Sequence, residues 1–381
     1  MKPGSSFYSL KISNIIPSFL LLLLVIFGTS NSFAGEHKEG AKFNPGKMIT
    51  EHITDAHDWH LWGEGNNSVS IPLPVIIYSS ESGLNVFMSS VFHHGHDIHK
   101  GFALKEGKVV VVNEQEGDAH TATINEEQTA GLWDISITKN VVSLFISIAL
   151  LMFIFVSVAK AYNARPGQAP KGLQGLIEPL VIFVRDDIAK SSIGEKKYMK
   201  FLPFLLTAFF FIWINNLLGL VPVFPGGANL TGSISITFTL ACITFLLVLF
   251  NGNKHYWHHI FAMPGVPGWV LFLLTPIEIL GVFLRPFVLM IRLFANITAG
   301  HIIALSFFSL IFIFGEMGAG AGFGAAIFSI AFTVFMTCLE LLVAFLQAYV
   351  FTLLSAIYIG AAVEEPHHNH SHLEAEEPHV I

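Results

Sequence analysis

From residue 138 onward, the chain alternates long apolar segments with short polar ones. The apolar segments cover residues 138–158, 201–221, 233–250, 269–314 and 324–362. A helix of about 20 apolar residues crosses a bilayer core about 30 Å thick, so the first three segments have the length of single transmembrane helices. The pattern predicts an all-α polytopic membrane protein with five transmembrane helices.

The last two apolar segments are longer than one crossing needs. At about 1.5 Å per residue, the segment at 269–314 would form a helix about 69 Å long. We therefore expect each segment either to be broken, with Pro276 and Pro286 as the breaks in the first, or to lie steeply tilted. The glycine-rich link at residues 315–322 is short enough to join the two as a long antiparallel hairpin.

Residues 173–190 show apolar side chains at the spacing of one helix face. These positions are Leu173, Leu176, Ile177, Leu180, Val181, Val184 and Ile188. The spacing predicts an interfacial amphipathic helix that lies along the cytoplasmic side of the membrane. Pro179 should kink or interrupt this helix.

The first 135 residues divide into a leader and a polar region. Residues 1–34 combine a weakly basic start, a short apolar run and small residues at the end, which predicts a cleaved signal peptide; an uncleaved first span is the alternative. Residues 35–135 are acidic and rich in histidine, and we expect a small extracytoplasmic extension. Alternation and turn signals predict strands in this extension at 68–78, 85–92 and 108–113.

Basic residues set the expected orientation of the membrane domain, which we assign to residues 136–363. The basic residues that follow its first apolar segment are Lys160, Arg165, Lys171, Lys190, Lys196, Lys197 and Lys200. Positive charge marks the cytoplasmic side, so the mature N-terminus should lie outside and the C-terminus in the cytoplasm, with the chain in a bacterial inner membrane. The acidic tail at 364–381 has no periodic apolar pattern and is predicted to be disordered.

Composition supports the membrane assignment and narrows the chemistry. The chain is 53% hydrophobic and 12% charged, and its net charge of -7 argues against nucleic-acid binding. Both cysteines, Cys242 and Cys338, lie in apolar segments, so we expect no disulfide framework. The histidines between 93 and 99 lack cysteine neighbours or a fixed ligand spacing, so they indicate a hydrated, pH-responsive surface rather than a metal site. We expect neither a metal nor a cofactor.

The two long segments contain few polar side chains. The first holds Glu278, Arg285, Arg292, Asn296 and His301, and the second holds Glu340 and Gln347. In an antiparallel hairpin, one register places Arg292 level with Gln347 and, within two residues, His301 level with Glu340. At about 100° per residue, Glu278 and Arg292 share a helix face, and His301 points to the opposite one.

Arg292 lies in the middle of its apolar segment, where an arginine costs roughly 2.5–3.5 kcal/mol to insert. Its charge cannot be removed, because the pKa of arginine exceeds about 12. We expect His301 and Glu340 to exchange protons with the outside and Glu278 with the inside, so Arg292 separates the two regions. A proton would then have to pass Arg292 on a carboxylate carried by a moving partner.

Several of these residues have simpler interpretations. Asn296 could make only a helix-packing hydrogen bond, and Gln347 could be structural. Glu278 could lie at the interface rather than line a channel. Arg285 is better interpreted as a cytoplasmic anchor than as a transport residue.

The stretch Arg292-Leu293-Phe294-Ala295-Asn296, with Ala299-Gly300 and with Gln347-Ala348 in the next segment, resembles subunit a of the F-type ATP synthase. The resemblance covers about residues 138–363. It implies a stator beside a rotating ring of c subunits, held with the subunit b peripheral stalk and the remaining ATP synthase complex in a lipid bilayer. Such a chain is no enzyme on its own, but a channel subunit of a proton-transporting complex.

The resemblance also implies roles for individual residues. Arg292 would match the arginine that separates two half-channels. The outward half-channel would contain Asn296, His301, Glu340 and Gln347, and the inward one Glu278.

This sequence departs from the bacterial pattern of that family at two places. His301 and Glu340 are exchanged, since the acid usually lies on the first helix and the histidine on the second. Gly219 stands where the pattern has an acidic residue. The alternatives are a self-contained secondary transporter that uses Arg292 as an anion ligand, and a membrane-anchored metal or pH sensor that uses residues 35–135. We see no internal repeat of the kind that transporters show.

Overall fold

The computed structural model describes residues 44–62, 69–105, 107–221, 226–263 and 266–364. The predicted signal peptide lies outside the described residues, as does the predicted tail apart from Glu364. The chain divides into two compact units, Met1–Phe43 with His60–Ile71, and Asn44–Trp59 with Pro72–Ile381.

The region before the membrane helices contains short strands in three small sheets. Its elements are α2 (Pro45–Ile53), β1 (Asp58–Trp62), β2 (Val69–Pro72), β3 (Pro74–Ser79), β4 (Gly83–Met88), the 3₁₀ helix η3 (Ser89–Gly95), β5 (Phe102–Lys105), β6 (Lys108–Val111), α3 (Glu126–Ala130) and β7 (Trp133–Asp134). The strand β1 pairs with β2, β5 pairs with β6, and a three-stranded sheet has the order β4-β3-β7. Val75, Ile77 and Phe92 are among the residues of the core beneath that sheet.

Two predicted strands differ from the observed ones. The predicted strand at 68–78 is two strands, because Pro72 and Pro74 flank Leu73 and prolines cannot donate to a ladder. The predicted strand at 85–92 ends at Met88, where the chain turns into η3. The alternation of apolar and polar side chains could not reveal where these strands end, because it does not show which backbone groups form hydrogen bonds with another strand.

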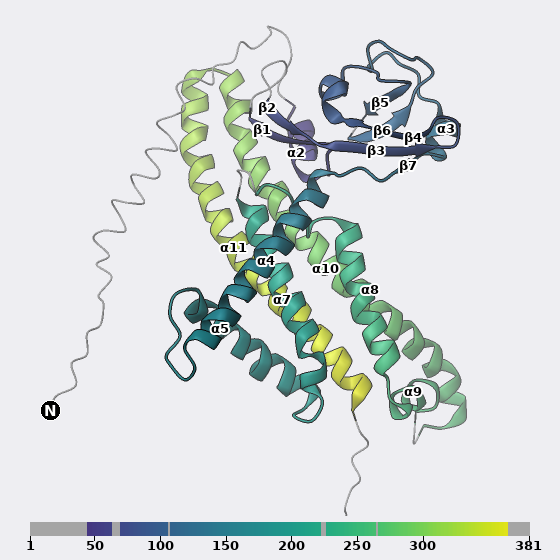
Figure 1. Ribbon diagram of the computed structural model, residues 1–381, viewed down its shortest axis with the longest axis vertical. Coiled ribbons are helices and arrows are strands. Elements are labelled where there is room, and N and C mark those ends of the chain that lie inside the picture. The colour runs from purple at the N-terminus through teal and green to yellow at the C-terminus, as the bar shows by residue number, and fades with distance from the viewer. Residues whose placement is uncertain (1–43, 63–68, 106, 222–225, 264–265, 365–381) are drawn as a thin grey trace, which may run out of the picture. The chain divides into compact units, whose positions relative to one another are not determined.

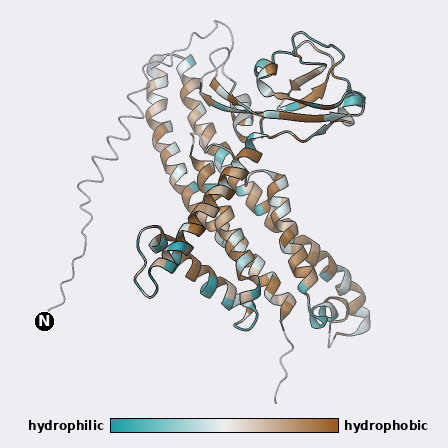
Figure 2. Cartoon of the chain, in the orientation of Figure 1, coloured by the Kyte–Doolittle hydropathy of each residue, from teal (hydrophilic) through white to brown (hydrophobic). Residues whose placement is uncertain are grey.

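Five helices are long and apolar enough to cross a membrane among the described residues, which confirms the predicted polytopic helical class. They are α4 (Lys139–Ala164), α7 (Tyr198–Leu220), α8 (Ile234–Asn251), α10 (Gly268–Glu316) and α11 (Ala319–Val363). Figure 2 shows hydrophobic residues along most of their lengths. The short helix α9 (Lys254–Phe261) between α8 and α10 was not predicted.

The segment after α4 contains α5 (Leu173–Phe183), the π-helix η4 (Val184–Lys190) and α6 (Ser191–Ile193). Of the two effects predicted for Pro179, an interruption of the helix is wrong, because α5 continues through it, and a kink stays a prediction. In η4, Arg185 makes two hydrogen bonds to Asp186, of 2.8 and 2.7 Å, and these lower the pKa of Asp186 to about 2. The placement of this segment at the cytoplasmic interface stays a prediction.

The helices α10 and α11 form the predicted hairpin, and they lie side by side in Figure 1. The suggested breaks at Pro276 and Pro286 are wrong, since α10 runs for 49 residues through both. Each proline removes one backbone hydrogen bond, which neighbouring helices can compensate. An unbroken helix of this length spans about 73 Å at 1.5 Å per residue, which leaves tilting as the way to fit a bilayer.

The main membrane core surrounds α7. Its buried side chains include Phe209 and Phe210 of α7, Leu289 and Leu293 of α10, and Phe351 of α11. Because Leu289 and Leu293 lie one turn apart on α10, they fix which face of this helix turns toward the core. The rotation of α10 in turn decides where its polar residues point.

Candidate functional site

Contacts at three levels define the register between α10 and α11. The rings of Phe307 and Phe332 have centroids 3.9 Å apart. Further along the hairpin, His301 Nδ1 lies 4.0 Å from Glu340 Oε1. Arg285 then lies over the ring of Tyr358, with 5.7 Å from its Cζ atom to the ring centroid. This is one antiparallel register, and it places Arg292 at the level of Gln347, between the second and third contacts.

The His301–Glu340 pair is mostly enclosed. The side chains are 20% and 13% exposed, and their closest oxygen and nitrogen atoms are too far apart for a hydrogen bond. Within the described residues, Glu340 Oε1 is buried without a hydrogen-bond partner. An acid and a base that face each other without a direct bond leave room for a water or a proton donor between them.

Two glycines create the space around this pair. A Cβ atom on Gly300 would lie 2.6 Å from Glu340 Oε1, so any larger residue there would displace the carboxylate. A Cβ atom on Gly219 of α7 would lie 3.7 Å from His301 Nε2. The bacterial pattern that this sequence resembles has an acid at the position of Gly219, and in this chain His301 lies next to that position.

Arg292 occupies a different face of α10. Its neighbour Leu293 and the preceding-turn residue Leu289 are buried, whereas Arg292 is exposed, as are the apolar side chains of Val288 and Ile291. Across the described part of the chain, no ion pair or hydrogen bond of Arg292 is found. A permanent cation on an apolar helix face needs an anionic partner.

Asn296 and Gln347 lie near Arg292 along the hairpin but in different surroundings. Asn296 is exposed one turn beyond Arg292 on α10. Gln347 is buried on α11, three residues beyond the Ala344 carbonyl that α7 binds. No hydrogen bond joins Arg292 to either side chain in the described structure. The structure thus brings these residues to one stretch of the hairpin without joining them into a network.

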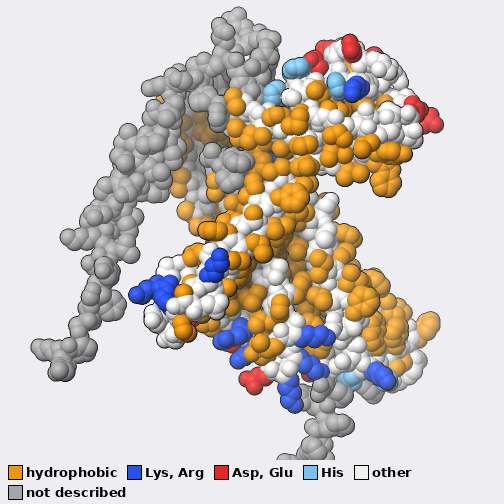
Figure 3. Space-filling view, in the orientation of Figure 1, with side chains coloured by type: hydrophobic (Ala, Val, Ile, Leu, Met, Phe, Trp, Pro, Cys, Tyr) orange, Lys and Arg blue, Asp and Glu red, His pale blue; other side chains and the backbone are white. Residues whose placement is uncertain are grey.

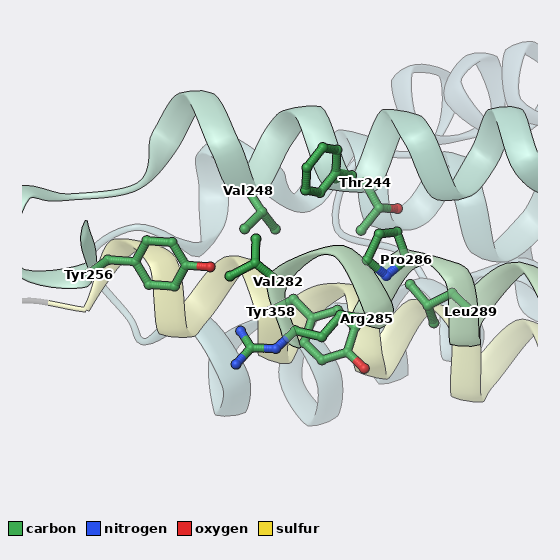
Figure 4. A pocket seen from close by; sticks show the side chains of 9 residues that line it. Thr244, Val248, Tyr256, Val282, Arg285, Pro286, Leu289 and Tyr358 are labelled. Carbon is green, nitrogen blue, oxygen red and sulfur yellow. The ribbon is translucent and has the colours of Figure 1, made fainter. Parts of the chain in front are cut away.

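Glu278 lies towards the other end of α10, near a small pocket where α8, α9, α10 and α11 meet (Figure 4). The pocket is lined by Thr244, Phe245, Val248, Tyr256, Val282, Arg285, Pro286, Leu289 and Tyr358. Burial raises the pKa of Tyr256, with Arg285 opposing and Glu278 adding to this effect. Glu278 and Arg285 are therefore close enough to Tyr256 for their charges to act on its hydroxyl.

Sequence reasoning missed polar residues that connect the helices. Asn216 of α7 donates a hydrogen bond of 3.1 Å to the carbonyl of Ala344 and accepts one of 2.6 Å from Thr231. The hydroxyls of Ser329 and Thr333 on α11 are buried without partners among the described residues. Their polar side chains stand out within apolar segments, and this pattern could have identified them. The pattern does not show which neighbouring helix each side chain faces.

Several described histidines of the extension lie within hydrogen-bond distance of other side chains. His57 is 4% exposed, with Nδ1 3.0 Å from the carbonyl of Gly107 and Nε2 2.9 Å from Asp134 Oδ2. Burial lowers the pKa of His57, but the hydrogen bond and charge of Asp134 outweigh this effect and raise it overall. His96 and His120 face each other with ring nitrogens 3.1 Å apart. In the described ranges, no group of three or more ligand-type residues could hold a metal ion.

Comparison with known proteins gives matches over both parts of the chain. Residues 141–360 match the family model described as ATP synthase A chain. Residues 48–135 match a domain of unknown function, DUF8433.

Individual relatives match about two thirds of this chain. The ATP synthase subunit a of Chloroherpeton thalassium is 44% identical over 249 residues, which cover 64% of this chain and 71% of that protein. The ATP synthase subunit a 2 of Chlorobaculum tepidum is 47% identical, over 63% of this chain and 66% of that protein. The ATP synthase subunit a of an Anaeromyxobacter species is 40% identical, over 66% of this chain and 61% of that protein.

Proposed function

This chain belongs to the ATP synthase A chain family, and on that premise we propose that it is the stator subunit through which protons reach and leave a rotating ring of c subunits. The chain is a multi-pass membrane subunit of the CF(0) sector, which serves proton transport and ATP synthesis, and it is one part of a multi-subunit complex rather than a catalyst by itself. The proposal adds two half-channels, with Arg292 as the barrier between them.

The observation that carries the proposal is the position of Arg292. It is a permanent charge, exposed on an apolar face of α10, with no partner in the described part of its own chain. A deprotonated carboxylate on the ring would supply the missing anion. As the ring turns, a carboxylate that meets Arg292 must give up its proton first, because the positive charge favours the ionised form. The same charge repels a free proton, so leakage past Arg292 is suppressed.

The outward half-channel is assigned to the His301–Glu340 pair, with Asn296 between that pair and Arg292 on α10 and with Gln347 level with Arg292 on α11. The facing acid and base, 4.0 Å apart, can relay a proton through an intervening water. Either group can hold the proton, so exchanging their positions relative to the bacterial pattern preserves the chemistry.

The inward half-channel is assigned to Glu278. It lies fourteen residues before Arg292, about 21 Å along a straight helix and nearly on the same face. A ring carboxylate that has passed Arg292 would release its proton towards Glu278. In this orientation, the mature N-terminus lies outside a bacterial inner membrane, the C-terminus lies in the cytoplasm, and subunit b holds the stator in place.

The test uses the whole complex in lipid vesicles with an imposed proton gradient. Arg292→Ala should abolish ATP synthesis while the complex still assembles with its c ring, and it should raise passive proton leakage through the membrane sector. Arg165→Ala, at the C-terminal end of α4, is the matched control and should support normal synthesis. Normal coupled synthesis in Arg292→Ala would refute the assignment and favour a secondary transporter or a snorkelling role for Arg292.

A further inference from the structure

One face of the sheet β4-β3-β7 is apolar and exposed. The register pairs Tyr78 with both Leu84 and Trp133, and Ile76 with Val86, so these side chains share a face. We call this the outer face; its most exposed members are Tyr78, Leu84, Val86, Met88, Trp133 and Ile135. Leu84 is 65% exposed and Trp133 is 69% exposed. The opposite face, with Val75 and Ile77, is buried in the core of the extension.

An antiparallel sheet that faces water on one side normally carries polar residues there. The outward positions of β3 and β4 are instead Pro74, Ile76, Tyr78, Leu84, Val86 and Met88. Figure 3 shows hydrophobic side chains along one side of this region and acidic side chains at its other edges. A contiguous apolar patch of this kind marks a contact surface rather than scattered exposed residues.

Backbone hydrogen bonds set the distance between the end of the sheet and the start of the first membrane helix. Beyond β7, Ile135 donates to the carbonyl of Ile76 at 2.8 Å, and Ile137 donates to that of Pro74 at 3.0 Å. The pairing with β3 therefore continues to two residues before α4, which begins at Lys139. At about 3.3 Å per residue, the sheet ends about 7 Å from the start of the first membrane helix.

The junction itself is held by further hydrogen bonds. The backbone N–H groups of Lys139 and Asn140 donate to the Ala56 carbonyl and to Asp55 Oδ1. The Lys139 ammonium donates to the carbonyl of Thr54 at 3.1 Å. The sheet is therefore tied to the start of a candidate membrane helix, and α4 exposes Phe145, Met152 and Phe153, whose apolar side chains suit a lipid environment.

We propose that the outer face docks on the interfacial region of the lipid bilayer. This contact would anchor the extension to the membrane surface beside the start of α4. Tryptophan and tyrosine are favoured at the depth of the headgroups, and the outer face includes Trp133 of the edge strand β7 beside Tyr78 of β3. The aliphatic side chains beside them suit the boundary between headgroups and acyl chains. The proposal gives the extension a role separate from the proton path.

The test places a polarity-sensitive fluorophore on single cysteines in the whole ATP synthase complex. With Cys242 and Cys338 replaced by serine, Leu84→Cys and Val86→Cys report on the outer face. Glu116→Cys, on an exposed loop of the same region, is the matched control. The complex is reconstituted in vesicles of phosphatidylethanolamine and phosphatidylglycerol, with or without lipids brominated near the headgroup end of their acyl chains.

Labels at 84 and 86 should emit at shorter wavelength and be quenched by the brominated lipids, and the label at 116 should be quenched by aqueous iodide alone. Iodide quenching at 84 and 86 equal to that at 116 would overturn the proposal. Protection from both quenchers would also overturn it, because a protein partner would then cover the face. Two outer-face positions keep the test decisive if one variant fails to assemble, and proton transport is not part of the readout.

Discussion

His301 on α10 and Glu340 on α11 face each other across the hairpin, with 4.0 Å between Nδ1 and Oε1. Among the described residues, they form an acid–base pair that joins the two long helices. The separation exceeds a hydrogen bond, and Gly300 provides the space that the Glu340 carboxylate occupies. The pair is thus positioned to interact through charge or through a bridging water rather than to lock the helices together.

Exchanging the pair tests whether its members act together. His301→Glu and Glu340→His should each slow ATP-driven proton pumping, because each leaves two like groups facing one another. The double exchange restores one acid and one base. Its pumping rate relative to the unaltered complex should exceed the product of the two single relative rates by about 2- to 150-fold, which corresponds to the coupling of about 0.5–3 kcal/mol seen for residues in contact. Effects that simply multiply would show that the two residues act separately.

Adding one methyl group at Gly300 should displace the Glu340 carboxylate. The Cβ of Gly300→Ala would lie 2.6 Å from Glu340 Oε1, and the flexible side chain can move aside without unfolding the hairpin. We expect normal assembly with proton pumping reduced by up to about 100-fold, as for a misplacement of about 1 Å at a reacting group. Gly281→Ala on the same helix meets no atom within 4 Å and should leave pumping unchanged. Equal pumping in the two variants would contradict this role of Gly300.

Asn216 should matter for stability, since it joins α7 to α11. Asn216→Ala leaves the buried Ala344 carbonyl and Thr231 hydroxyl without that partner, at a cost of about 1–3 kcal/mol per group. The midpoint of thermal unfolding in detergent should fall. Thr239→Ala, which removes an exposed hydroxyl bound within its own helix, should change it little. An unaltered midpoint in Asn216→Ala would mean that water replaces the lost bonds.

The His57–Asp134 ion pair should make the junction before α4 sensitive to pH. The pKa of His57 is raised in the fold, so its contribution is complete below about pH 6.5 and is lost as the pH rises through the folded value. The pKa of Asp134 is lowered, so its contribution is present above about pH 3.9 and is lost as the pH falls through the folded value. Stabilisation by the pair is therefore largest at mildly acidic pH.

Hydrogen exchange measured on the intact protein can follow this loss. After correction for intrinsic rates, peptides that cover residues 54–58 and 132–137 should exchange faster at alkaline pH, since losing a charge-assisted hydrogen bond costs about 1.5–3 kcal/mol. Asp55 also favours the charged form of His57, so Asp55→Asn should reduce the effect in part. His57→Gln, which cannot titrate, should remove the pH dependence; if the dependence persists there, another group causes it.

Sequence patterns located the membrane helices within a few residues, except that α4 ends six residues beyond its predicted end and α11 begins five residues before its predicted start. They also placed His301 and Glu340 at one level. Patterns failed at Pro276 and Pro286, where the expected breaks are absent from α10, and at Leu73, where two prolines divide a strand. In each case the outcome depends on contacts that a pattern along one segment does not contain: α10 packs against neighbouring helices, and Leu73 bonds to Ser89 rather than to a strand.

The sequence by itself determined the five membrane helices, the hairpin and the isolated cation at Arg292, because hydropathy and the cost of burying charge depend on residue type along a single segment. Only the tertiary structure decided that Gly300 contacts Glu340, that Asn216 binds Ala344, and that Tyr78, Leu84 and Trp133 form one exposed face. Those contacts depend on the rotation of each helix and the register of each strand. Backbone pairing sets the register of the strands, and packing of side chains such as Leu289 and Leu293 sets the rotation of α10; both join residues from different segments of the chain.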